Sequence, residues 1–468
     1  MLQIYNTLTK KIEEFKPMKA GHVNMFVCGP TVYDYIHIGN ARTFVIFDVV
    51  AKYLRWRGYS VHYVQNITDI DDKIIDRARE VGEDPLKFAQ RWEKEFHTDM
   101  KALHVTAPNR YVPATEHIPA IIRQIEDLIA NGCAYEISDG IYFDLSKFPE
   151  YGKLSGRTAL ADDDAVSQID ENNEKRNRGD FCLWKRSKES EPSWSAPWFS
   201  GRPGWHIEDT AITEYYFGPQ YDLHGGGRDL IFPHHEAEIT QQESASGLKP
   251  FVRYWMHTGF LENRTAKMSK SLGNFKTTRE SNKDYSSEVL RLYFLSAHYR
   301  SSLDFSEQTL TQAEAGVQRI GEFMDRLRSA EEHKPFSSTC DPEVTKAVTK
   351  IKNRLTEAMD DDFNTPQAIA AIFDLVHLGN QYIDTDKLDL ECAGQILEIL
   401  DFGHAVLGII PMRRTPLSQD IRELVAQRQA ARDAKDFEKS DQLRDELAKL
   451  GWSVDDTPWG PRIKKKAS

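Results

Sequence analysis

The sequence predicts an α/β protein: a parallel-sheet catalytic domain with an inserted subdomain, then an α-helical bundle and a small C-terminal domain. Three observations predict it. A strand, a helix and a second strand follow one another within the first 64 residues. A strand-like segment near residue 222 runs into three glycines, and from about residue 282 the apolar spacing is almost wholly helical. A strand–helix–strand unit of this length indicates a parallel, right-handed crossover.

The first unit shows the pattern clearly. Residues 22–28 form an apolar, β-branched segment that a glycine and a proline end, which indicates a buried strand. Residues 41–56 carry apolar side chains at steps of three and four, as a helix does, and residues 60–64 are a second strand. Ligands of such Rossmann-type sheets bind beyond the carboxyl ends of the strands. We therefore expect the loop over residues 29–40 to line the active site.

The spacing divides the chain into three expected domains. The catalytic domain covers residues 1–281 with an insertion at about 105–200, residues 282–411 form a connecting region and helical bundle, and residues 412–468 form the C-terminal domain. The polar stretch 330–343 is expected to be a loop. Near the end, an apolar stripe indicates core packing, while the charged residues beside it either face RNA or form a solvated surface. The stripe is Leu443, Leu447 and Leu450, and the charged residues are Asp436, Asp441 and Arg444.

Composition restricts the class of protein. The 468 residues carry a net charge of −12, which does not suit a nonspecific nucleic-acid binder, so any RNA must be held by local basic patches and shape. Five widely spaced cysteines, an odd number, argue against a disulfide framework and for a reducing, cytoplasmic location. No run of about 18 apolar residues predicts a membrane span.

The loop after the first strand contains His37-Ile38-Gly39-Asn40. A glycine lets a nucleotide approach the backbone, and a helix start favours a phosphate. An imidazole there can stabilise charge on a reacting phosphoryl group. Taken alone, four residues fit a tight turn with a surface histidine just as well. We predict that His37, Gly39 and Asn40 bind ATP and that His37 is also catalytic.

Two further segments add to this motif. Lys267 and Lys270 lie among small residues, and a mobile loop of this kind can neutralise phosphates as pyrophosphate leaves, although two lysines alone could be a solvated loop. The segment 224–229 reads HGGGRD, which alone could be a glycine turn. In this order the three motifs resemble those of class I aminoacyl-tRNA synthetases. The resemblance implies that Lys267 and Lys270 are catalytic and that Gly225, Gly226, Asp229 and Lys270 bind ATP.

Four residues suggest a metal site. Cys28 ends the first strand, Asp209 precedes the glycine segment, and His234 and Glu238 lie four apart on a predicted helix, so that both project from one face. Thiolate, imidazole and carboxylate are the ligands that zinc uses in proteins. Taken singly, a His-x-x-x-Glu pair is more often a surface contact, and a lone cysteine is more often a small buried hydrophobe.

The whole arrangement resembles the cysteinyl-tRNA synthetase family over nearly the full chain. The segments that carry the resemblance are FVCGPTVYD at 26–34, NITDIDDK at 66–73, PGWHIE at 203–208, FPHHE at 232–236 and DDFNTP at 361–366. It implies activation of L-cysteine by ATP with magnesium and transfer to the tRNA for cysteine. It also implies one zinc ion per chain on Cys28, Asp209, His234 and Glu238, and an amino-group site at Thr68 and Trp205.

Zinc suits the selection of cysteine over serine, which differs only by oxygen for sulfur. The ion prefers nitrogen and thiolate ligands and lowers the pKa of a thiol, so no editing site is needed. The chain departs from the family at two positions. Asp209 stands where a second cysteine is usual, which keeps the ligand charge but donates less than sulfur. Asn40 stands where histidine is frequent, and it can still donate a hydrogen bond.

Two other functions stay open from the sequence. A ligase that joins cysteine to an amino sugar would share the catalytic half but lack the anticodon-binding domain, which the resemblance implies for residues 412–468 of this chain. A catalytically inactive RNA-binding paralogue is disfavoured by the intact His37, Lys267 and Lys270. We expect a monomer.

Overall fold

The computed structural model describes residues 1–157, 172–262, 276–333, 341–385, 387–388, 390–411, 419–457 and 460–465. The chain divides into two compact units. The first comprises residues 1–316, 352–371 and 405–409, and the second comprises 317–351, 372–404 and 410–468. None of the described helices has the length and apolar character needed to cross a membrane.

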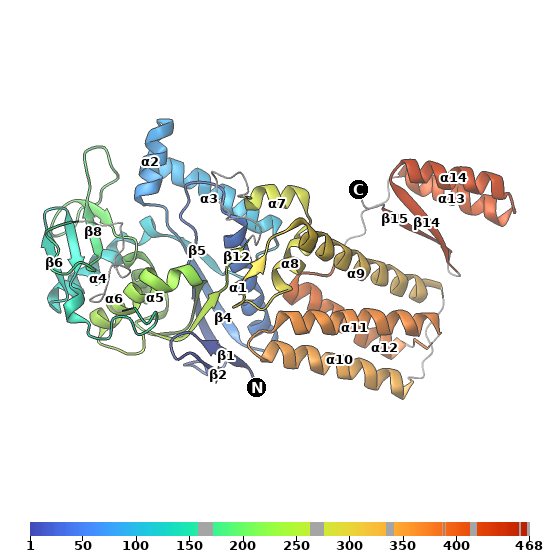
Figure 1. Ribbon diagram of the computed structural model, residues 1–468, viewed down its shortest axis with the longest axis horizontal. Helices are drawn as coiled ribbons and strands as arrows, with labels where there is room; N and C mark the ends of the chain where they lie inside the picture. The colour runs from blue at the N-terminus through green and yellow to red at the C-terminus, as the bar shows by residue number, and fades with distance from the viewer. Residues whose placement is uncertain are drawn as a thin grey trace. The chain divides into compact units, whose positions relative to one another are not determined.

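A five-stranded sheet forms the centre of the first unit (Figure 1). In the order β11-β10-β3-β4-β5, all neighbouring strands are parallel. The strands are β3 (His22–Val27), β4 (Ser60–Ile67), β5 (Arg110–Pro113), β10 (Tyr221–Gly227) and β11 (Val252–Thr258). Val23, Met25 and Phe26 of β3 have no exposed surface, as expected for a parallel strand covered on both faces. The predicted α/β class and parallel crossover are confirmed.

The crossover helix α1 (Ile38–Trp56) begins at Ile38 rather than at residue 41, because His37 caps it. The Nδ1 atom of His37 accepts a hydrogen bond from the Gly39 N–H at 3.1 Å. Strand β4 continues to Ile67 rather than ending at residue 64. The apolar pattern stops early because the next two residues, Gln65 and Asn66, are polar, although both are buried. An apolar pattern therefore underestimates a strand whose end faces a polar site.

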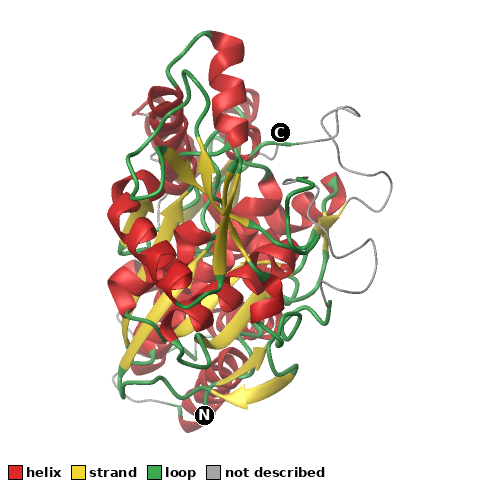
Figure 2. Cartoon of the chain, turned by 90° about the vertical axis from the view of Figure 1, so that its left-hand side faces the viewer, coloured by secondary structure: helices red, strands yellow, loops and turns green. Residues whose placement is uncertain are grey.

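Helices pack around this sheet, and smaller sheets accompany it (Figure 2). The helices are α2 (Asp72–Val81), α3 (Pro85–Ala102), α4 (Ile118–Ala130), α5 (Ile207–Phe217), α6 (Glu236–Ser246), α7 (Thr278–Asp284) and α8 (Ser287–Leu295). An antiparallel sheet contains β6 (Ala134–Ile137), β7 (Gly140–Phe143), β8 (Cys182–Arg186) and β9 (Gly201–Pro203). Two-stranded sheets pair β1 (Gln3–Asn6) with β2 (Lys11–Glu14) and β12 (Leu261–Glu262) with β13 (Leu303–Asp304).

Helices dominate the later part of the chain, as predicted. They are α9 (Glu307–His333), α10 (Pro342–Asp360), α11 (Thr365–Asp384) and α12 (Leu390–Phe402). The predicted loop over 330–343 is wrong at both ends, since α9 reaches His333 and α10 begins at Pro342. Glu331 and Glu332 are polar but good helix formers, and their propensity outweighs the polarity signal.

The C-terminal elements form a small core of their own. They are α13 (Gln419–Asp433), α14 (Phe437–Lys449) and the hairpin β14 (Trp452–Thr457) with β15 (Gly460–Lys465). Leu443 and Leu447 are buried, as predicted for the apolar stripe. Leu450 is 54% exposed, which corrects that prediction, because it caps the end of α14 where the helical spacing stops.

Candidate functional site

The candidate site lies at the carboxyl edge of the five-stranded sheet, where the sequence predicted it. Cys28 directly follows β3, and its N–H donates to the Gly225 carbonyl of β10 at 3.1 Å. Thr68 directly follows β4, and its carbonyl accepts from the Val32 N–H at 3.1 Å. These bonds hold loops from three strands at one edge, so that residues distant in sequence meet there.

The four predicted metal ligands meet in one buried cluster. One ligand atom from each of Cys28, Asp209, His234 and Glu238 lies within 4.8 Å of the others. Cys28 Sγ lies 3.4 Å from Asp209 Oδ2 and 3.9 Å from Glu238 Oε1. His234 Nε2 lies 3.1 Å from Asp209 Oδ2 and 3.0 Å from Glu238 Oε1. Such separations suit donors that share one ion through bonds of about 2.0–2.3 Å.

Two helix starts and one irregular turn position these ligands. Asp209 lies in the first turn of α5 and Glu238 in the first turn of α6. His234 lies in an irregular turn, Ile231–His235, which is kinked at Phe232, where the backbone is extended (φ −138°, ψ 132°). The predicted regular helix is therefore wrong where it begins. The two side chains nevertheless converge, because this turn runs directly into α6.

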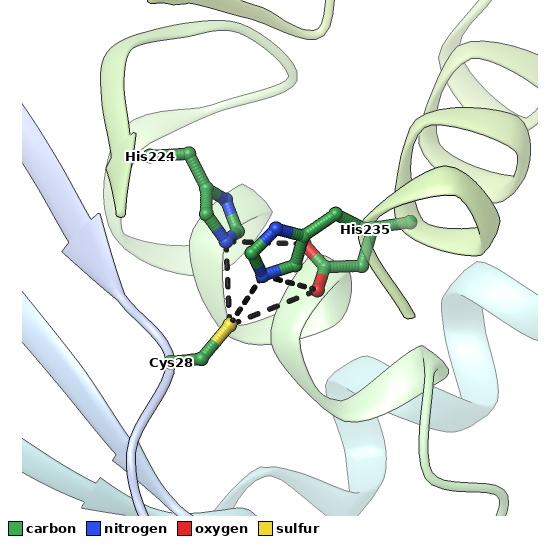
Figure 3. Close-up of side chains that lie close together, drawn as sticks. Cys28, His224 and His235 are labelled. Atoms are coloured by element: carbon green, nitrogen blue, oxygen red, sulfur yellow. Dashed lines mark hydrogen bonds and ion pairs between the residues drawn. The ribbon is translucent and has the colours of Figure 1, made fainter. Parts of the chain in front are cut away.

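His224 and His235 also face the cluster, which sequence reasoning missed (Figure 3). Cys28 Sγ lies 3.3 Å from His224 Nε2 and 3.1 Å from His235 Nε2. With Cys28 and Glu238 they make a second group of four donors within 4.8 Å. Their Nδ1 atoms are engaged elsewhere, His224 with the Tyr221 hydroxyl at 2.6 Å and His235 with another imidazole at 2.8 Å. A histidine before three glycines and a doubled histidine were signals in the sequence that could have found them.

Burial and mutual repulsion disfavour ionisation of two acidic side chains in the cluster, Cys28 and Glu238. Burial raises the pKa of the Cys28 thiol well above its usual value, and Glu238 and Asp209 raise it further. Burial also raises the pKa of Glu238 to about 7, against the opposing effect of His234. Burial disfavours a charge on His234, but Glu238 and Asp209 outweigh it and raise that pKa to about 10. Three acidic groups thus surround one base, and their sulfur, nitrogen and oxygen donors suit a zinc-like divalent ion.

The residues predicted to hold the amino acid border this cluster. The Trp205 ring stacks on His234 with centroids 4.4 Å apart and an interplanar angle of 15°. The Thr68 hydroxyl donates to Glu208 Oε2 at 3.1 Å. Glu208, which sequence reasoning also missed, is fully buried, and burial raises the pKa of its carboxyl group well above the usual value.

The predicted nucleotide residues lie at the same edge of the sheet. His37 begins α1, with Gly39 and Asn40 in its first turn. A Cβ atom at Gly225 would lie 2.4 Å from the Phe47 ring, and one at Gly226 would lie 2.7 Å from His235, so neither position accepts a side chain. Asp229 is exposed in the short turn that follows β10.

Lys267 and Lys270 lie outside the described residues. The chain that follows them is bonded to the His37 loop. The Ile38 N–H donates to the Lys276 carbonyl at 3.2 Å, and the Thr278 N–H donates to the Ile36 carbonyl at 2.9 Å. Residues 276–278 are therefore held beside the first nucleotide motif.

A parallel sheet with a histidine loop and a glycine segment at its carboxyl edge defines a class I aminoacyl-tRNA synthetase catalytic domain. Residues 14–315 match the family model described as tRNA synthetases class I (C) catalytic domain. Residues 354–411 match the DALR domain, and residues 414–460 match the cysteinyl-tRNA ligase anticodon binding domain. With the full-length relatives described next, these matches show that the chain belongs to the cysteine–tRNA ligase family.

Relatives match along almost their whole length. The cysteine–tRNA ligase of Heliobacterium modesticaldum is 43% identical, with 99% of each chain covered. Those of Thermococcus gammatolerans and Pyrococcus horikoshii are 45% and 46% identical, with 98% and 97% of each chain covered. Among solved structures, a Mycobacterium tuberculosis methionyl-tRNA synthetase bound to methionyl-adenylate shares the fold, with a TM-score of 0.64 at 15% identity. The match covers 82% of this chain and 92% of that one.

Proposed function

We propose that the chain ligates cysteine to its tRNA with a zinc ion held by Cys28, Asp209, His234 and Glu238. Membership of the cysteine–tRNA ligase family assigns the ligation. The observation that carries the zinc proposal is the meeting of four buried donors at the carboxyl edge of the sheet. When bound, the ion supplies a Lewis acid that favours a thiolate over a hydroxyl group.

The nucleotide residues have separate roles in this proposal. His37 stabilises charge on the phosphoryl group under attack, and Lys267 and Lys270 neutralise the departing pyrophosphate. The cysteine carboxylate is itself the nucleophile, so the enzyme forms no covalent intermediate of its own. The glycines let the backbone approach the nucleotide closely, and two polar side chains assist binding. The glycines are Gly39, Gly225 and Gly226, and the polar residues are Asn40 and Asp229.

The amino-acid end of the pocket follows from the contacts of two residues. The Thr68 hydroxyl donates a hydrogen bond to Glu208 and accepts a long one of 3.4 Å from the Asn66 amide, which leaves one lone pair of its oxygen for the substrate ammonium group. Trp205 lies flat on His234, so it closes the pocket over a metal ligand. Both residues therefore act on the orientation of cysteine rather than on bond making. We also propose that the protein is a cytoplasmic monomer. Its molar mass in solution tests the oligomeric state.

The experiment is pyrophosphate exchange across all amino acids, with and without tRNA, combined with metal analysis of the purified protein. We expect exchange with cysteine alone and about one zinc per chain. Cys28→Ser should lose both, whereas Cys133→Ser, at a half-buried cysteine outside the cluster, should keep both. A fully active, metal-free protein would overturn the zinc site. If the protein activates cysteine but then couples it to an amino sugar and not to tRNA, the alternative ligase would be favoured.

A further inference from the structure

Asn66 connects the loop that carries Cys28 to Asp209. It lies near the carboxyl end of β4 and is 2% exposed. Its Oδ1 accepts from the Gly29 N–H at 2.5 Å, and its Nδ2 donates to Asp209 Oδ1 at 2.6 Å. A Cβ atom at Gly29 would lie 1.7 Å from the Asn66 carbonyl oxygen, so only glycine permits this close approach.

These two hydrogen bonds fix the direction in which the amide faces. A backbone N–H can only donate, so Oδ1 must face Gly29 and the NH₂ group must face the carboxylate. Asp209 Oδ1 is thereby occupied. Its other oxygen, Oδ2, lies toward the cluster, 3.4 Å from Cys28 Sγ and 3.1 Å from His234 Nε2. The aspartate therefore presents a single oxygen to the metal site.

We infer that Asn66 is a positioning residue that makes Asp209 a one-oxygen metal ligand, an inference that rests on the proposed metal site. A carboxylate has two equivalent oxygens and can rotate, whereas a thiolate has one donor atom and needs no such partner. Asp209 is 1% exposed, so without Asn66 its buried Oδ1 would lose the hydrogen bond that the amide donates to it. Outer partners of this kind are typically worth about 10–100-fold in metal affinity.

The test is a double-mutant cycle on the full-length protein. The Zn²⁺ dissociation constant is measured by competition with a chromophoric chelator. Asn66→Ala should raise the Kd about 10–100-fold when residue 209 is aspartate. In the Asp209→Cys background the same change should alter the Kd about threefold or less, because sulfur is a weak acceptor. The visible absorption of bound Co²⁺ should likewise shift with Asn66→Ala only in the aspartate background.

Two further variants keep the test decisive. Gln65→Ala removes the neighbouring amide of β4, which is 1% exposed, and should leave the Kd unchanged. Thermal melting of the metal-free proteins reports whether each variant folds. If Asn66→Ala does not fold, Asn66→Ser replaces it. The serine oxygen lies one bond nearer the backbone than the amide nitrogen, so it is too short to reach Asp209 directly, while a polar group remains in the buried space.

An equal rise in Kd in both backgrounds would overturn the inference, because Asn66 would then act through Gly29 and Cys28 alone. An unchanged Kd in the aspartate background would overturn it as well. Failure of the proposed metal site gives a different result: Asp209→Ala would bind Zn²⁺ as tightly as the natural chain. The two failures are therefore distinguishable.

Discussion

Metal binding to the buried cluster should depend steeply on pH, because its ligands must lose protons to bind. Between pH 6 and pH 8 the ionised fraction of Glu238, with a pKa of about 7, rises about tenfold. The neutral fraction of His234, with a pKa of about 10, rises about a hundredfold. Cys28, whose pKa lies well above its usual value, adds about another hundredfold. All three groups act in one direction, so the affinity should fall by several decades from pH 8 to pH 6.

The assay is zinc competition between the full-length protein and a chelator of known proton dependence, at pH 6, 7 and 8. Proton release on zinc addition in weak buffer gives an independent count. Glu238→Gln should lower the affinity and remove at least about one decade from its pH dependence, because loss of this carboxylate also lowers the pKa of His234. Cys133→Ser should keep the natural profile. A total change of less than about one decade would refute the reasoning, because the bound ion would then not displace the protons of these ligands.

Three other predictions follow from the same site and from the chain beyond it. Asp209→Cys should keep exchange activity and tighten metal binding, whereas Asp209→Ala should lose both, as metal analysis and exchange rates would report. Zinc removal should collapse cysteine activation far more than the weak serine rate, because four decades of selectivity need roughly 5–6 kcal/mol and packing alone gives ~1–3 kcal/mol. Hydrolysis of seryl-tRNA by this protein would contradict the absence of an editing site. Deletion from residue 412 onward should keep cysteine-dependent exchange but lose much of the charging efficiency, since that part matches an anticodon binding domain. Full charging by the truncated chain would refute the anticodon assignment.

The sequence predicted the set of metal ligands partly from simple rules of sheet and helix geometry and partly from the family resemblance. Cys28 ends a buried strand, and such ends gather at one edge of a parallel sheet. Asp209 was predicted from the resemblance to cysteinyl-tRNA synthetases, because no spacing rule places it next to Cys28, which is 181 residues away in the sequence. The approximate position of each element was therefore predictable, while the kinked turn that carries His234 was not, because the extended backbone of Phe232 interrupts the helical periodicity.

The residues that sequence reasoning missed share one physical property. His224, Asn66 and Glu208 are polar side chains buried within regular elements, His224 in the middle of β10 and the other two near an end. Their roles depend on contacts across the sheet, such as the 2.6 Å bond from Asn66 to Asp209. Apolar periodicity reports which residues avoid water, not which buried polar groups pair with one another. Such pairs become visible only when the register of neighbouring strands is known.

The aspartate at position 209 changes the donor set without changing its charge. In the proposed metal site, Cys28, Asp209 and Glu238 would supply three anions around His234, so the electrostatic demand for a divalent cation would be the same as with a second thiolate. Oxygen donates less charge than sulfur, which would leave a bound ion more acidic toward a substrate thiol but also harder. Greater acidity of the ion favours binding of cysteine, whereas greater hardness reduces the preference of the ion for sulfur over oxygen. Because the ligand charge is constant, the cysteine-to-serine activation ratio of Asp209→Cys relative to the natural chain measures the balance of these effects directly. A higher ratio in the variant would mean that softness governs selection in this site, and a lower ratio would mean that acidity does.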